Sequence, residues 1–129
     1  MMKRVVVLTA WAVALLMVAG PLCAHHGMGT YDGQRLTTVK GTVTRFDFFN
    51  PHVLLYFDVK DASGKVVKWV AETGSPNMMH RAGWNKTTLK SGEEITVTGH
   101  PAKDGSPNMR FRKVLLPDGQ ELNPEGAFD

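Results

Sequence analysis

Histidine is the residue type in this chain best suited to bind a ligand by coordination. The sequence has five histidines and one cysteine. His25 and His26 are adjacent, His52 follows an Asn-Pro pair, and His100 precedes a proline. Neutral imidazole is a good ligand for copper, zinc and nickel. We therefore predict a transition-metal site built from His25, His26, His52 and His100, with copper as the first candidate and zinc or nickel after it.

Residues 1–24 have the pattern of a secretory signal peptide. A basic start precedes an apolar run from Val5 to Val18, and the small residue Ala24 stands just before the histidine pair. This pattern predicts a periplasmic protein without a membrane anchor after cleavage. Two alternatives fit less well. The apolar run is short for an uncleaved span, and the residues before Cys23 are a poor match to a lipid-attachment site.

The cleavage point decides which chelate the new amino terminus can form. Cleavage after Ala24 leaves His25 first, so that its amine and its imidazole can bind one metal ion together. Cleavage after Cys23 leaves His26 as the third residue. The amine, two deprotonated backbone amides and the imidazole then form a square-planar site suited to Cu(II) or Ni(II).

Residues 25–37 are polar and rich in glycine, and we expect them to form an extended arm without regular structure. Thirteen extended residues span about 40 Å, so the arm is long enough to reach either His52 or His100. Glu72 lies diagonal to His52 in the strand register predicted below. Its carboxylate could orient the His52 ring as metal-bound histidines require. The alternative is that these histidines are structural or solvated.

A second functional hypothesis is a ligand- or protein-interaction module. Leu54, Tyr56 and Val70 are predicted on the outward face of the second and third strands. They would form a partly apolar patch that binds a small ligand or a periplasmic protein, or that packs under the arm. Of these possibilities, we favour packing of the N-terminal arm against the patch.

The composition excludes several other functions. The mature chain keeps 13 basic and 12 acidic residues, a formal charge of +1, because Lys3 and Arg4 leave with the signal. We therefore expect no nucleic-acid binding, and we interpret Arg110 and Arg112 as a solvated strand face. No nucleophile or metalloprotease motif is present, so we predict no enzyme. A small catalytic metal site is the remaining alternative, and it would need an open coordination position.

Alternating apolar residues predict strands over 38–48, 52–60, 94–99 and 109–116. A third strand follows a hairpin loop at Ala62-Ser63-Gly64. The favoured hairpin register pairs Val59 with Val67, Phe57 with Trp69, Leu55 with Ala71, and Asp58 with Lys68. A switch of parity in the first strand predicts a bulge between Val43 and Phe46.

A short helix is predicted from Pro76 to Ala82, with Ser75 as N-cap and Gly83 at its end. Three strands, one short helix and two strands are the order of an OB-fold. We therefore predict an all-β protein, a small five-stranded Greek-key barrel over residues 38–122, with one short helix between the third and fourth strands. A loose tail is expected over 123–129.

The chain also resembles a family of small exported bacterial proteins known only as a domain of unknown function. The resemblance covers nearly all of the mature chain, and it supports export and a small β-barrel without implying an activity. The shared motifs are Ala24-His25-His26, Phe49-Asn50-Pro51-His52, Trp69 with Glu72, Gly83-Trp84, Leu89 with Gly92, Gly99-His100-Pro101-Ala102, and Asp104-Gly105.

Overall fold

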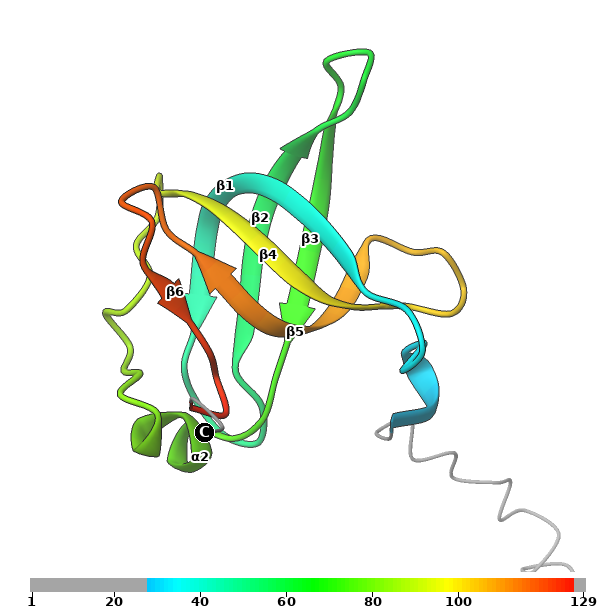
Figure 1. Cartoon of the computed structure of the whole chain (residues 1–129). Coiled ribbons are helices and arrows are strands. Elements are labelled where there is room, and N and C mark those ends of the chain that lie inside the picture. Colours follow the sequence, from blue (N-terminus) through cyan, green and yellow to red (C-terminus); the bar gives the residue numbers. More distant parts are fainter. Residues whose placement is uncertain (1–27, 127–129) are drawn as a thin grey trace, which may run out of the picture.

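The computed structural model describes residues 28–126 (Figure 1). The predicted signal peptide, His25 and His26 lie outside the described residues. The elements are η1 (Met28–Thr30), β1 (Thr37–Asp47), β2 (Leu54–Lys60), β3 (Val66–Glu72), α2 (Pro76–Arg81), β4 (Glu94–Pro101), β5 (Asn108–Leu115) and β6 (Glu121–Leu122). Within the described range, no helix combines the length and the hydropathy needed to cross a bilayer.

The strands form one sheet that closes on itself. The strand order is β3-β2-β1-β4-β5-β6, and β3 also pairs with β5 in parallel. That extra pairing joins the two ends of the five-strand array, and β6 adds two residues to the edge of β5. The predicted fold class, an all-β OB-like barrel with one short helix between β3 and β4, is confirmed.

The first strand bends so that it serves both sides of the barrel. It pairs with β2 through its second half and with β4 through its first half. The register shifts between Val43 and Arg45, where the bulge was predicted. At Gly41 a Cβ would lie 2.6 Å from the carbonyl oxygen of Asp58, so glycine is what allows the strands to approach here.

The β2–β3 hairpin has the predicted register. Val59 faces Val67, Phe57 faces Trp69, and Leu55 faces Ala71. The tip of this hairpin extends beyond the rest of the barrel (Figure 1).

The short helix and the segment after it close one end of the barrel. Ser75 caps α2 by accepting a hydrogen bond from the Met78 amide. Trp84 is only 2% exposed and packs against Phe111 inside the barrel. Trp69 is half-buried and stacks against Phe57.

The N-terminal arm and the C-terminal tail, expected to be irregular or loose, both contact the barrel. The arm forms η1, and Tyr31 then makes a β-bridge with Ala102. At the other end, the Asn123 carbonyl accepts a hydrogen bond from the Trp84 indole, and Pro124 is buried. Both segments are held because they cover polar or apolar groups that the barrel leaves open.

Candidate functional site

One row of outward side chains crosses four strands of the barrel. Leu54 on β2 faces Glu72 on β3, Glu72 faces Arg110 on β5, and Arg110 faces His100 on β4. All four residues are half-buried. Because neighbouring strands lie about 5 Å apart, Glu72, Arg110 and His100 form one compact polar group on the outer surface.

The row depends on how β4 and β5 meet. The prediction ended the fourth strand at Gly99, but β4 continues to Pro101 and carries His100 into the sheet. A register shift between Thr98 and Gly99 aligns His100 with Arg110. A Cβ on Gly99 would overlap the backbone of Arg110 and Phe111, so this close approach requires glycine.

The arm lies against this row. Its Thr30 carbonyl accepts a hydrogen bond from the Lys103 amide, and the Asp32 amide donates to the Pro101 carbonyl. Tyr31, between them, hydrogen-bonds to the Glu72 carboxylate. Burial, that hydrogen bond and the negative charge of Glu72 raise the pKa of Tyr31 well above its ordinary value of 10.0, while the positive charge of Arg110 opposes the shift.

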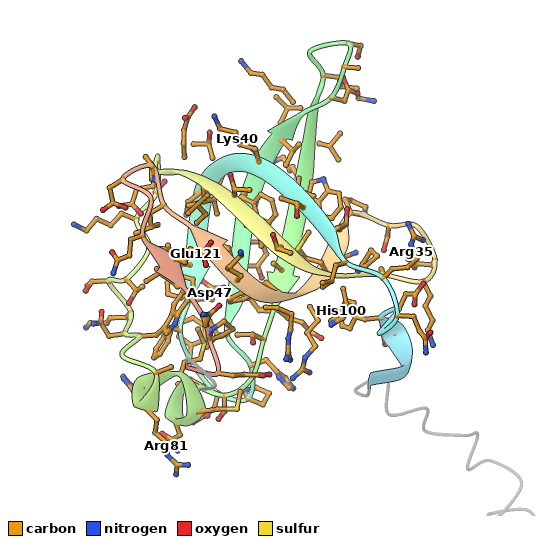
Figure 2. The ribbon with its side chains drawn as sticks, in the orientation of Figure 1. Arg35, Lys40, Asp47, Arg81, His100 and Glu121 are labelled. Carbon is orange, nitrogen blue, oxygen red and sulfur yellow. The ribbon has the colours of Figure 1, made fainter. Side chains whose placement is uncertain are left out.

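The arm also orients His100. The Nδ1 atom of His100 lies 2.8 Å from the Arg35 carbonyl oxygen. A carbonyl can only accept, so Nδ1 carries the proton and donates it. In the neutral ring, Nε2 is then left with a lone pair. Figure 2 shows Arg35 and His100 near η1, far from α2, on which Arg81 lies.

A cavity of about 250 Å³ opens beside the row. It is lined by Tyr31, Gly33, His100, Arg110 and Arg112. The guanidinium of Arg112 contacts the Glu125 carboxylate at 2.7 Å. Within residues 28–126 the Arg110 guanidinium has neither a hydrogen bond nor an ion pair, although Glu72 faces it in the sheet.

His52 lies elsewhere, in the connection between β1 and β2. Its Nδ1 atom is 3.2 Å from the Thr73 carbonyl oxygen, in the segment that leads to α2. Glu72 hydrogen-bonds to Tyr31, and its predicted role in orienting the His52 ring stays a prediction. The carbonyls beside the Nδ1 atoms of His52 and His100, those of Thr73 and Arg35, therefore belong to different segments of the chain.

The described residues do not complete a metal site by themselves. Between residues 28 and 126 there is no cluster of three or more histidine, cysteine, aspartate or glutamate side chains with metal-binding geometry. His80 is exposed on α2 and meets the edge of the Phe48 ring. The predicted metal site also requires His25 and His26 as ligands, and both lie outside the described residues.

The arm was expected to pack against the predicted partner face on β2 and β3, but Arg45 lies against Tyr56 there. Tyr56 faces Val70 as predicted, but the guanidinium carbon of Arg45 stands 3.9 Å from the Tyr56 ring centre. The described part of the arm lies instead along the end of β4. A shallow cavity of about 340 Å³ lies here, lined by Thr44, Arg45, Tyr56, Phe57, Asp58, Lys68, Trp69 and Val70.

Four cavity residues were absent from the predicted site: Tyr31, Gly33, Arg110 and Arg112. The two arginines share one strand parity, which places them on the same outward face. That signal was readable, but it could not distinguish a solvated face from a cavity wall. No sequence pattern indicated that Tyr31 would meet Glu72, because the two are brought together by the docking of the arm.

Comparisons with known proteins identify a family. No curated protein matches the chain. Among solved structures, a ZRD-deleted mutant of TiaS in complex with agmatine is similar at 17% identity and a TM-score of 0.48. That match covers 73% of this chain, which spans only 28% of TiaS.

A small single-stranded DNA-binding protein from Streptomyces coelicolor is similar at 11% identity and a TM-score of 0.42. It covers 67% of this chain, which spans 94% of that protein. A family model described as "Family of unknown function (DUF6152)" matches residues 12–110. The chain therefore belongs to the DUF6152 family.

Proposed function

We propose that the mature protein is a periplasmic binding protein that captures a transition metal ion, copper first. The ligands would come from the N-terminal amine, His25 and His26, with His100 completing the site. Export rests on the signal-peptide pattern of residues 1–24.

The observation that carries the proposal is the hydrogen bond from His100 Nδ1 to the Arg35 carbonyl. Histidines that bind metals usually donate their other ring N–H to a backbone carbonyl or a carboxylate, which holds the ring and its tautomer. Here the carbonyl belongs to the same arm that carries His25 and His26. The ring is therefore prepared for a metal by the segment that would deliver the remaining ligands.

The docking of the arm favours His100 over His52 as the partner of the N-terminal histidines. His26 is five residues before Tyr31, which is held against β4 through Ala102. Five extended residues reach about 17 Å, enough for His26 to reach His100. Because Nδ1 of His100 donates to the Arg35 carbonyl, the metal would bind at Nε2.

The test is a Cu(II) titration by calorimetry on mature protein purified from the periplasm without an N-terminal tag. Native mass spectrometry of the same sample would identify the first residue and any bound metal. We expect one Cu(II) per chain. The double variant H25A/H26A should lose this binding, and H100A should weaken it.

H80A is the matched control, because His80 is an exposed histidine away from the arm. It should bind Cu(II) like the wild type, and H52A should resemble it. Equal affinity in the wild type and in H25A/H26A would contradict the proposal. Equal loss in H52A and H100A would contradict the preference for His100.

The second candidate function is an interaction module on the outer face of β2 and β3. The shallow cavity beside Tyr56 and Val70 favours it, since both aromatic and charged side chains line that surface. In this case Y56A would lose a periplasmic partner that the wild type retains in pull-downs, and H25A/H26A would keep it. The reverse pattern would exclude this candidate.

A further inference from the structure

We propose a second binding site, which shares His100 with the proposed metal site but does not depend on metal binding: the cavity beside Arg110 binds a small organic monocarboxylate. The primary observation is that a half-buried arginine lines this cavity without a hydrogen-bond or ion-pair partner anywhere in residues 28–126. A guanidinium carries five N–H donors and no acceptor. Leaving such a group partly buried and unpaired is costly, so an anion in the cavity would relieve that cost.

The surroundings explain why Arg110 lacks an internal partner. Glu72 faces it across the β3–β5 pairing, but the Glu72 carboxylate is engaged by the Tyr31 hydroxyl. On the other side in the sheet stands His100, whose Nδ1 donates to Arg35. Glu72 and the Arg35 carbonyl thus hydrogen-bond to other donors, and Arg110 has no hydrogen-bond or ion-pair partner within residues 28–126.

Arg112 provides a neighbouring example of a guanidinium that holds a carboxylate. It lies two residues further along the same strand face, and its guanidinium holds the Glu125 carboxylate at 2.7 Å. The planar guanidinium fork matches a carboxylate through two parallel hydrogen bonds. Arg110 lines the same cavity, so a ligand carboxylate can meet it as Glu125 meets Arg112.

The charges around the cavity limit the ligand to one negative group. The Glu72 and Glu125 carboxylates contact Tyr31 and Arg112, which line the cavity. Each carboxylate would repel a second anionic group on the ligand. The Tyr31 ring and the backbone of Gly33 offer surface to an uncharged body. At roughly 30 Å³ per water, the cavity holds about eight waters, which is room for a molecule of the size of benzoate.

The experiment is a benzoate titration of metal-free, 15N-labelled mature protein at low salt, followed by amide chemical shifts. We expect saturable shifts at Tyr31, Gly33, His100 and Arg110. R110Q should bind benzoate at least about tenfold more weakly, the expected effect of losing hydrogen bonds to a charged group. R110K, which keeps the charge but not the fork, should also bind more weakly than the wild type.

Three controls make the result specific. Benzamide, the uncharged analogue, should not bind, and H25A/H26A should bind benzoate like the wild type, which separates this site from the proposed metal site. R112K keeps a charge near Glu125 and should have a smaller effect than R110K. If R110Q does not give a folded spectrum, R110K decides the question.

Several outcomes would overturn the proposal. They are the absence of saturable shifts at the cavity, equal binding by the wild type and R110K, or equal binding of benzoate and benzamide. Inorganic phosphate is titrated in parallel. If phosphate saturates the same amides and benzoate does not, the site is an inorganic-anion site and the assignment to an organic carboxylate is wrong.

Discussion

Tyr31 and Glu72 hydrogen-bond to each other although 41 positions separate them in the sequence. The contact joins the N-terminal arm to the seam where β3 and β5 close the barrel. It also gives the carboxylate that faces Arg110 across that seam a hydrogen-bond partner on the arm. This side-chain contact anchors the arm beside Arg110, which has no hydrogen-bond or ion-pair partner within residues 28–126.

The contact predicts opposite effects of two substitutions on the ionisation of Tyr31. The chain has only two tyrosines, so a Y56F background leaves Tyr31 as the single phenol. Adding E72Q removes a negative charge and should lower the pKa of Tyr31, without returning it to 10.0, because burial is the largest cause of the shift. Adding R110Q removes a positive charge and should raise it. Phenolate absorbance against pH measures both, and shifts of the same sign would contradict this account.

The raised pKa of Tyr31 also predicts how stability depends on pH in the alkaline range. The folded protein holds the phenol proton more tightly than the unfolded chain does. The resulting stabilisation is present below pH 10 and is lost as the pH rises above 10. Urea unfolding of the Y56F protein should therefore show stability falling with pH in that range. Y31F in the same background is the control, and its fall should be smaller.

Substituting Thr73 should stabilise the protein. Its Oγ1 is buried and has no hydrogen-bond partner within residues 28–126. Valine has nearly the same shape without the hydroxyl, so Thr73→Val should raise the free energy of unfolding by about 1 kcal/mol. Thr44→Val, at an exposed position on β1, is the control and should change stability little. Equal or lower stability in Thr73→Val would indicate that its hydroxyl finds a partner.

Gly99→Ala should destabilise the barrel and disturb the row at Arg110. The added methyl group would overlap the backbone of Arg110, which cannot move away as a flexible side chain could. We expect a loss of about 1–3 kcal/mol, measured by urea unfolding. Gly29→Ala is the control, since a Cβ there meets no neighbour. Equal stability of the two variants would contradict the close approach of β4 and β5.

Removing the chain after Leu122 should cost about 3 kcal/mol. The truncation removes the carbonyl that accepts the Trp84 indole N–H, which then loses its partner. It also removes the buried Pro124 and the Glu125 partner of Arg112. Thermal unfolding measures the loss. A chain ending at Gly126 keeps these contacts and is the control, and equal unfolding of the two truncations would restore the idea of a loose tail.

Much of the barrel could be predicted because its signals are local. The alternation from Val53 to Val59 and the glycine in the Ala62-Ser63-Gly64 loop were sufficient for the hairpin register, since a slip by one residue would bury Lys68. The parity switch after Val43 located the bulge, and Ser75-Pro76 located the helix start. Each of these depends on residues a few positions apart.

The surroundings of the candidate sites could not be predicted in the same way. Which histidine the arm approaches was open, because chain length allowed both His52 and His100. The bridge from Tyr31 to Ala102 decides this in favour of His100. The surroundings of Arg110 could not be predicted either, since they depend on the hydrogen bond between Tyr31 of the arm and Glu72.

The sequence by itself determined the order of the strands and the helix along the chain, the hairpin register and the all-β barrel, because alternation and turn residues act over short distances. It also supplied the histidines and the export pattern on which the metal proposal rests. Only the tertiary structure decided that β3 closes onto β5, that the arm docks along β4, and that Arg110 lines a cavity with no hydrogen-bond or ion-pair partner among the described residues. These features join residues far apart in the chain, and their energies depend on what each polar group meets after folding.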